Sequence, residues 1–399
     1  MKITTTDIAI VTDGFWRKSL SAVRSLGAAN YRVCVLGDSI FTTSFWSSYT
    51  SKRILVPDIK NHSSEFYKIL LNFWNHQKPL KPILFPMEDE TLMWLSDNRE
   101  KMAKYFDFII PPKKSLVIAQ SKNLTMRIAK SLTIPIPKTY SFSSYEKFIK
   151  KIDAINNKKL FSKYLVKPIS GSGSIGIIYL SSKLKQFDFK SHWDNFGPLL
   201  IQEKLQGNGK AIGVSLLMDK NSNCIASFVH QRIKQYPNSG GPSTQRISIV
   251  NKKLLKYSTK LLKKLNWKGV AMVEWKEDLS SGNMRLLEIN PRFWGSLELA
   301  VRSGVNFPVL YADLSKDRKV ESVHSYKTGV SCRWMFPGDI LRYISEEKVT
   351  RESIFKFLTG LPFEAEEWNS RDLKGTLSSL LCPIFQVVKP KHWKFLFRK

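Results

Sequence analysis

Short apolar runs alternate with helical patterns through the first part of this chain. Residues 7–12 (D-I-A-I-V-T) and 31–36 (Y-R-V-C-V-L) are apolar and rich in β-branched residues, and a helical pattern over 19–26 separates them. A strand, a helix and a second strand in so short a stretch are typical of a β-α-β unit with parallel strands. We therefore expect residues 1–112 to form a small doubly wound α/β domain, with further strands at 53–56, 82–86 and 106–110.

The pattern changes after Pro135 and Pro137, which end the preceding helix over 122–132. Short strands then follow one another, mostly as hairpins, and this order is typical of an α+β unit. The expected strands lie at 165–167, 175–180, 199–203, 211–218, 224–229, 269–275 and 284–289. A long helical pattern over 339–358 follows them, in a part of the chain that is harder to assign.

The amino-acid composition says more about the cellular compartment of the protein than about its function. The 63 Lys and Arg residues against 33 Asp and Glu give a net charge of +30, which favours anionic partners but does not choose among them. A lysine-rich genome would give the same bias without any function. The four cysteines have no C-x-x-C spacing, so neither a zinc site nor a disulfide framework is indicated. Neither a signal peptide nor a membrane-spanning stretch is recognisable, and we expect a cytoplasmic protein.

Polar side chains follow a strand in residues 286–296, L-L-E-I-N-P-R-F-W-G-S. Glu288 and Asn290 are two residues apart, so their side chains point to the same face of the sheet. Carboxylate and amide oxygens suit Mg²⁺, which also keeps positions for nucleotide phosphates. Arg292 has a planar fork that holds a phosphoryl or carboxylate group. The alternative is a strand that ends in a polar turn without a ligand.

Glu274 interrupts the otherwise apolar strand G-V-A-M-V-E-W over 269–275. If this strand pairs with the one that carries Glu288, the alternation of side chains places the two carboxylates together. Two neighbouring carboxylates repel each other unless a cation lies between them. The pattern therefore predicts a metal site, and the alternative is an edge-strand glutamate that faces water.

A loop of small residues follows Lys167 at the end of another expected strand. Glycines let backbone N–H groups approach phosphate oxygens closely, and a lysine adds a point charge. The loop is not a P-loop, because it lacks G-K-[ST] and no helix follows it. Lys122 at the start of a helix would reach the same phosphates, and Glu203 after a strand would accept from the adenine amine. The alternative for each of them is an ordinary surface side chain without a ligand. A hairpin without a ligand is the alternative for this loop, which consists of Ser170, Gly171, Ser172, Gly173 and Ser174.

Taken in this order, the segments resemble the ATP-grasp superfamily, which includes biotin carboxylase, carbamoyl-phosphate synthase and D-alanine–D-alanine ligase. The likeness covers residues 5–315, and its most specific part is Glu274 followed by Glu288-x-Asn290-x-Arg292. It implies a mixed α/β and α+β architecture of four parts. These are an N-terminal doubly wound pre-ATP-grasp domain (1–112), a lid subdomain (113–200), a metal and substrate subdomain (201–325) and a basic C-terminal extension (326–399).

The resemblance also implies roles for individual residues. One or two Mg²⁺ ions, or Mn²⁺ in their place, would bind Glu274, Glu288 and Asn290, and Arg292 would steady the acyl phosphate. The ATP phosphates would contact Lys122, Lys167 and the loop over 170–174, which is part of a mobile lid. Adenine would contact the segment Gln202, Glu203, Lys204 and Leu205. The acid or histidine that holds the ribose in many members is absent after this segment, so the ribose contacts stay open.

Residues 229–246 (V-H-Q-R-I-K-Q-Y-P-N-S-G-G-P-S-T-Q-R) resemble a substrate loop of carboxylate–amine ligases in the same superfamily. Arg232 would bind the acceptor carboxylate, and the flexible Ser239-Gly240-Gly241 would present N–H groups to it. The alternative is a basic hairpin with no substrate.

These features predict an ATP- and Mg²⁺-dependent ligase that activates a carboxylate as an acyl phosphate for attack by an amine. Small-molecule acids and amines are the expected substrates, in the biosynthesis of a cell-surface polysaccharide or a peptide-like metabolite, and no nucleic-acid partner is expected. Two alternatives stay open: a nucleotide- or polyanion-binding protein without activity and, less favoured, a bicarbonate-using enzyme. Residues 373–399 contain no Asp or Glu, so peripheral contact of this basic segment with the inner membrane surface or a glycan stays open. Homodimerisation stays open as well.

Overall fold

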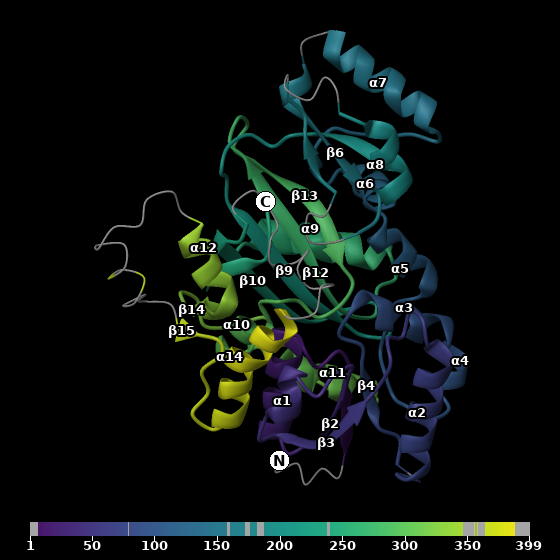
Figure 1. Ribbon diagram of the computed structural model, residues 1–399, viewed down its shortest axis with the longest axis vertical. Coiled ribbons are helices and arrows are strands. Elements are labelled where there is room, and N and C mark those ends of the chain that lie inside the picture. The colour runs from purple at the N-terminus through teal and green to yellow at the C-terminus, as the bar shows by residue number, and fades with distance from the viewer. Residues whose placement is uncertain are drawn as a thin grey trace.

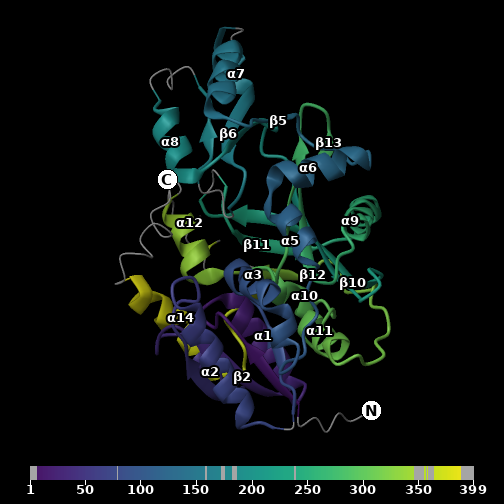
Figure 2. The same ribbon diagram turned by 90° about the vertical axis from the view of Figure 1, so that its right-hand side faces the viewer.

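The computed structural model describes residues 7–78, 80–157, 160–171, 176–181, 187–237, 240–345, 355, 357 and 364–387. Within these ranges three sheets follow one another along the long axis of the molecule (Figure 1). The view turned by 90° (Figure 2) shows the same order, with α7 and α8 at one end and the N-terminal domain at the other. The predicted mixture of α/β and α+β architecture is confirmed.

The N-terminal sheet is parallel, with the strand order β3-β2-β1-β4. Because the chain adds β2 and β3 on one side of β1 and β4 on the other, the strand order reverses between β1 and β4. Val11 pairs with Phe85, so the carboxyl ends of these two strands lie side by side. The elements are β1 (Ile8–Val11), α1 (Arg17–Ala28), β2 (Arg32–Gly37), the short helix η1 (Thr43–Trp46), β3 (Thr50–Leu55), α2 (Ser63–Asn75), β4 (Ile83–Phe85), α3 (Asp89–Asp97) and α4 (Arg99–Met102).

One expected strand of this domain is wrong. Over 106–110 only Asp107 pairs, in a single parallel bridge to Ile83. The prolines at 111 and 112 have no N–H to donate, and they lead directly into α5 (Lys113–Gln120).

The small sheet at the opposite end of the molecule is antiparallel, with the order β5-β8-β6-β7. Helices α7 and α8 supply Phe148, Ile152 and Phe189 to its core, against Val166 and Leu199 of the sheet. The elements are α6 (Lys122–Ser131), β5 (Thr139–Ser141), α7 (Tyr145–Asn157), η2 (Phe161–Lys163), β6 (Tyr164–Pro168), β7 (Ile178–Tyr179), α8 (Phe189–Phe196) and β8 (Leu199–Glu203).

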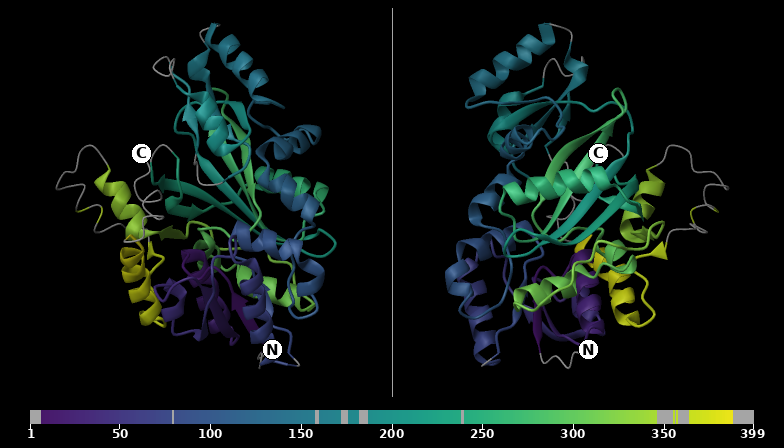
Figure 3. Two further views of the ribbon diagram at one scale, coloured as in Figure 1. Left: turned by 45° about the vertical axis from the view of Figure 1, so that its right-hand side comes forward. Right: turned by 180° about the vertical axis from the view of Figure 1, so that it is seen from behind.

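The central sheet has seven strands in the order β13-β12-β9-β10-β11-β14-β15. Alternate residues of β12 enter different cores. Val273 and Trp275 pack with Leu261 of α9, which lies across the face seen from behind in Figure 3. Met272 belongs to the core on the opposite face, which also contains Ala22 of α1, and this face therefore looks toward the N-terminal domain. The elements are β9 (Ala211–Met218), β10 (Cys224–Gln235), β11 (Ser243–Ser248), α9 (Lys252–Lys264), β12 (Gly269–Asp278), β13 (Asn283–Asn290), α10 (Leu297–Arg302) and α11 (Phe307–Ser315).

The C-terminal part of the chain also contributes to this sheet. Strands β14 (Ser331–Arg333) and β15 (Glu364–Ala365) pair in parallel and extend it beyond β11. Of the helix expected over 339–358, the structure describes α12 (Ile340–Ile344), which follows the kinked turn η4 (Met335–Asp339). The chain then forms α14 (Leu373–Val387). Among the described helices, none combines the length and apolar composition required to cross a membrane.

Candidate functional site

Two antiparallel strands bring the predicted metal ligands together. Glu274 of β12 lies directly opposite Glu288 of β13, and Met272 lies opposite Asn290. Nδ2 of Asn290 donates a hydrogen bond of 3.1 Å to Oε1 of Glu274. Both carboxylates are partly buried, on the sheet face that looks toward the N-terminal domain. The strand pairing that the sequence predicts is present, and metal binding by these three residues stays a prediction.

The electrostatics of this position suit a cation. Burial raises the pKa of the Glu274 carboxyl, Arg232 opposes that shift, and the charge of Glu288 adds to it. In the described ranges, no group of three or more His, Cys, Asp and Glu side chains is arranged to hold a metal ion. The third oxygen here belongs to the amide of Asn290. Two carboxylates and an amide oxygen are hard ligands of the kind that Mg²⁺ takes, so the side chains present fit this ion.

Two lysines, one on α6 and one on the small sheet, approach the same place. Lys122, the first residue of α6, has Nζ 4.0 Å from Oε2 of Glu288. Lys167 on β6 is almost fully buried, and burial together with the charge of Lys122 lowers its pKa to about 8. Two ammonium groups that repel each other beside one carboxylate favour the arrival of an anion. The contact of both lysines with phosphates stays a prediction.

Arg232 completes the positive side of the site from a third strand. Its Nη2 lies 3.3 Å from Oε2 of Glu274, and its Nη1 donates to the carbonyl of Gly241, 3.1 Å away. The second contact ties β10 to the loop that the sequence assigns to the substrate. Gly240 and Gly241 of this loop are described, whereas Ser239 lies outside the described residues.

Arg292 is held by acidic side chains that the sequence analysis did not assign to the site. Its Nε lies 3.3 Å from Oε2 of Glu88 and 3.2 Å from Oδ2 of Asp89. Although burial disfavours the guanidinium charge, these two carboxylates raise the pKa of Arg292 above its ordinary value. Both follow β4, at the point where the strand order of the N-terminal sheet reverses. That position is where open α/β sheets bind ligands, and this was the available signal.

Two further charged residues of the N-terminal domain, Lys18 and Asp13, lie near Glu88. Nζ of Lys18 lies 2.7 Å from Oε1 of Glu88, and burial lowers the pKa of Lys18 to about 8. Asp13 accepts a hydrogen bond of 3.1 Å from Thr91, and burial with the nearby Glu88 charge raises its pKa to about 6. The N-terminal domain therefore supplies Glu88 and Asp89 as direct partners of Arg292, and Lys18 contacts Glu88 behind them.

A small pocket lies between Arg232 and a buried histidine. Nε2 of His230 forms a hydrogen bond of 3.1 Å with Oγ of Ser296. Its Nδ1 is buried and has no partner among the described residues. Burial, with a smaller effect from Arg246, lowers the pKa of His230 to about 3, so the imidazole is neutral at neutral pH. The pocket wall is made by Ala211, Ile212, Gly213, His230, Arg232, Met272, Glu274 and Trp275.

The segment assigned to adenine follows β8. Gln202 is buried and donates 2.8 Å to Oγ1 of Thr139, so its side chain supports the small sheet. Glu203 is exposed, and its Oε2 accepts from the backbone N–H of Lys138, 3.2 Å away. The N–H of Lys204 donates 2.9 Å to the carbonyl of Lys163, and Leu205 is buried. Adenine binding by these residues stays a prediction.

The glycine loop is described only at its start. Nζ of Lys122 donates a hydrogen bond to the carbonyl of Gly171, and the N–H of Lys122 donates 2.9 Å to the carbonyl of Ile169. Gly171 has a φ of +108°, which favours glycine. Ser170 and Gly171 thus adjoin a predicted phosphate ligand. Ser172, Gly173 and Ser174 lie outside the described residues.

Comparison with known proteins finds a matching family and related sequences. Residues 195–336 match a protein family described as "ATP-grasp in the biosynthetic pathway with Ter operon". The chain is also 24% identical, over 190 residues, to a D-alanine–D-alanine ligase of Rickettsia peacockii. That match covers 44% of this chain and 58% of the relative, so the chain spans little more than half the length of the curated relative.

Solved structures resemble the chain over a larger share of its length. The biotin carboxylase–β,γ-ATP complex from Campylobacter jejuni has a TM-score of 0.65 at 15% identity, covering 82% of this chain and 74% of the carboxylase. An L-amino acid ligase from Bacillus licheniformis has a TM-score of 0.57 at 13% identity, covering 78% of this chain and 74% of the ligase. At such low identity these likenesses establish a shared fold.

Proposed function

The chain has the ATP-grasp fold that its sequence predicts, and from this premise we propose that it is an ATP- and Mg²⁺-dependent carboxylate–amine ligase. The observation that carries the proposal is the direct pairing of Glu274 with Glu288, with cationic side chains from three other elements around them. A carboxylate substrate and a triphosphate are both anions, so bringing them together requires this concentration of positive charge.

Each cationic side chain has a proposed task. Lys122 and Lys167 bind the ATP phosphates, and Arg232 binds the substrate carboxylate beside Glu274. Arg292 stabilises the charge of the phosphoryl group as it moves to the carboxylate. The bound Mg²⁺, for which Glu274, Glu288 and Asn290 are the proposed ligands, neutralises phosphate charge. An amine then attacks the acyl carbon, and phosphate leaves.

Several finer features belong to the same proposal. One or two Mg²⁺ ions, with Mn²⁺ as a substitute, bind the three oxygen ligands. The segment over 202–205 contacts adenine, and the loop over 170–174 covers the phosphates. We propose a cytoplasmic enzyme, capable of homodimerisation, that acts in the biosynthesis of a cell-surface polysaccharide or peptide-like metabolite. The basic tail over 388–399 lies outside the described residues, and its contact with a membrane or glycan stays a prediction.

A bicarbonate-using carboxylase is the second candidate, because one structural neighbour is a biotin carboxylase. The ligase is favoured by the sequence match to a D-alanine–D-alanine ligase and by the structural match to an L-amino acid ligase. A nucleotide-binding protein without activity is less favoured, because the paired carboxylates, the amide and four cations converge on one place.

The test is ATP turnover with pools of carboxylates and amines. A ligase releases ADP and phosphate only when both substrates are present, whereas a carboxylase requires bicarbonate and an acceptor. Glu288→Gln is expected to abolish Mg²⁺-dependent turnover and leave the thermal unfolding temperature unchanged. Glu277→Gln is the matched control, since Glu277 lies on the neighbouring strand β12 and its carboxylate accepts from the N–H of Lys210 at 3.1 Å. Full turnover in Glu288→Gln would contradict the assignment.

A further inference from the structure

Helix α14 presents its apolar side chains outward and its small polar residues inward. The inward positions are Gly375, Thr376, Ser378, Ser379 and Cys382, all of them buried. The outward positions are large and apolar, with exposed fractions between 36% for Leu380 and 58% for Leu373. Ordinary surface helices have the opposite orientation. We call the outward positions the α14 face: Leu373, Leu377, Leu380, Leu381, Ile384 and Phe385.

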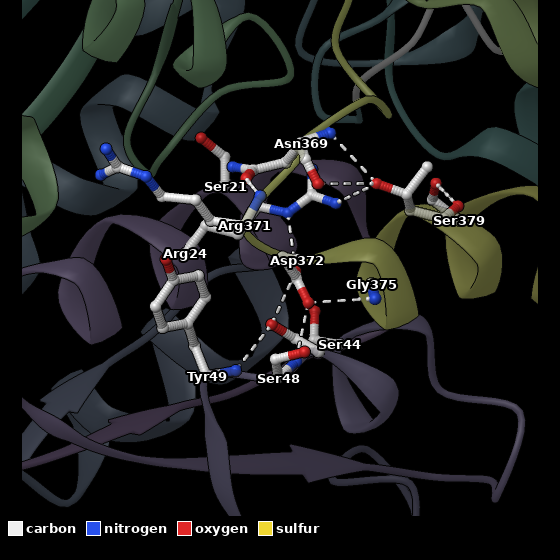
Figure 4. Close-up of polar contacts among 12 residues, drawn as sticks. Ser21, Arg24, Ser44, Ser48, Tyr49, Asn369, Arg371, Asp372, Gly375 and Ser379 are labelled. Carbon is white, nitrogen blue, oxygen red and sulfur yellow. Dashed lines mark hydrogen bonds and ion pairs between the residues drawn. The ribbon is translucent and has the colours of Figure 1, made fainter.

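Specific hydrogen bonds fix this orientation. Asp372 precedes the helix and accepts from the N–H of Gly375 at 3.1 Å, which is the geometry of an N-cap. The same carboxylate accepts 2.9 Å from Nε of Arg24 on α1 (Figure 4). One turn further, Oγ of Ser378 donates 2.9 Å to the carbonyl of Thr43. A rotation that buried the leucines would break all three contacts, so the outward apolar face belongs to the fold.

The apolar surface continues beyond the helix. Phe41 stacks on Phe385 with ring centroids 4.8 Å apart. Next to Phe41, Ile40 is 59% exposed, and its carbonyl accepts from the indole N–H of Trp46 at 3.0 Å. Figures 1 and 3 show α14 on the outer surface of the molecule, beside α1. Large exposed apolar patches of this kind mark sites of interaction.

The charge of the same segment favours a partner with anionic groups. Residues 373–399 contain no Asp or Glu, and α14 leads directly into a stretch in which lysine and arginine alternate with aromatic residues. Anionic lipid attracts such clusters of basic residues, and large apolar side chains enter the boundary between headgroups and acyl chains. The basic residues after the helix are Lys389, Lys391, Lys394, Arg398 and Lys399, interspersed with Trp393, Phe395 and Phe397.

We propose that the α14 face binds the surface of an anionic membrane, with the helix in the plane of the headgroups. A second copy of the chain fits less well. Pairing with a second copy would bring together two chains that each carry a net charge of +30, and like charges facing each other are unfavourable. The membrane contact goes beyond the proposed ligase activity and needs neither ATP nor substrate.

The test uses the full chain and sedimentation with lipid vesicles. Vesicles of phosphatidylcholine mixed with phosphatidylglycerol are expected to bind the protein, whereas phosphatidylcholine alone binds it weakly. The variant Leu377→Glu/Leu381→Glu is expected to reduce the partition coefficient by at least about a hundredfold, since burial of one leucine changes it about tenfold or more. Val250→Glu is the matched control, because Val250 is 60% exposed and lies outside the α14 face.

Two further measurements separate the alternatives. Thermal unfolding shows whether the double variant keeps its fold, and a fold defect is checked with the milder Leu377→Ser/Leu381→Ser. Equal vesicle binding by the wild type and a folded double variant would overturn the proposal. Sedimentation velocity without lipid identifies the other outcome. If the wild type dimerises through this face and binds no vesicles, the α14 face is a self-association surface and the membrane proposal is wrong.

Discussion

Nε of Arg292, just beyond β13, lies 3.2 Å from Oδ2 of Asp89, which begins α3 in the N-terminal domain. The cation proposed to stabilise the moving phosphoryl group is therefore positioned by a carboxylate from another domain. Glu88 makes a second contact of 3.3 Å with the same Nε. These contacts fix the direction of the guanidinium plane before any substrate binds, which is the preorganisation that transition-state stabilisation requires.

Arg292→Lys tests the role of the guanidinium fork. Lysine keeps the charge but loses the two parallel donors, so we expect kcat to fall by roughly a hundredfold to a thousandfold, or about 2.7–4 kcal/mol. Steady-state kinetics with the substrates identified by the turnover assay measure kcat and KM separately. Arg302→Lys is the control, since Arg302 pairs with Glu298 at 2.9 Å on α10, and its kcat is expected to match the wild type. A raised KM with unchanged kcat would assign Arg292 to substrate binding alone.

Local patterns in the sequence were sufficient to predict the pairing of the two acidic strands. Glu274 lies between buried apolar neighbours, and Glu288 lies two residues before Asn290, so alternation alone determines the face of each side chain. The pairing of the strands then followed from the hairpin between them. This part of the candidate site depends on a period of two residues and a short turn.

Contacts between domains were not predictable in the same way. Glu88 and Asp89 are visible in the sequence as an acidic turn, but only the docking of the N-terminal sheet on the central one brings them to Arg292. Helix α14 gives a second example. The hydrophobic period of residues 373–385 alone would place Leu377 and Leu381 inside, whereas the hydrogen bonds of Asp372 and Ser378 place them outside.

We expect ATP binding to depend on pH because of the lowered pKa of Lys167. Burial and the neighbouring Lys122 lower its pKa to about 8 in the absence of ATP, and phosphate oxygens raise it again in the complex. Between the two pKa values, the dissociation constant of ATP is expected to increase about tenfold for each unit by which the pH rises. Calorimetric titration from neutral pH to about pH 9 measures this increase.

Lys167→Arg is the control for that pH dependence. Arginine stays charged over the whole range, so the pH dependence attributable to position 167 is expected to disappear. If the wild type and Lys167→Arg show the same slope, another group causes the dependence.

We expect substitutions at Gly213 and Ser215, both on β9, to affect the free energy of unfolding differently. A Cβ atom at Gly213 would lie 2.3 Å from Cε1 of His230, so Gly213→Ala forces the buried imidazole to shift and is expected to cost about 1–3 kcal/mol. Oγ of Ser215 is buried and has no partner in the described part of the chain. Ser215→Ala is expected to leave the free energy of unfolding unchanged or raise it. Urea unfolding measures both, and a stable Gly213→Ala would show that His230 is free to move.

We expect the stabilisation that Asp372 gives to the packing of α14 on α1 to be lost at low pH. Burial alone would raise the pKa of this carboxyl, but the hydrogen bond from Arg24 and those from Ser48 and Ser47 hold it below the ordinary value of 3.8. The carboxylate therefore stabilises the fold above pH 3.8, and this contribution is lost as the pH falls through the lower pKa of the folded state. At neutral pH, Asp372→Asn is expected to cost about 3 kcal/mol or more, since it leaves Arg24 buried without a counter-ion.

Urea unfolding of the wild type and Asp372→Asn over a series of pH values measures this contribution. The difference in unfolding free energy is expected to be constant near neutral pH and to shrink toward acid, because protonation of Asp372 makes the two proteins alike in charge. Asp194→Asn is the control, since Asp194 pairs with Lys190 at an exposed position on α8, where ion pairs contribute little. A difference that did not change with pH would mean that the Arg24–Asp372 contact stabilises α14 through shape and hydrogen bonding, without a contribution from charge.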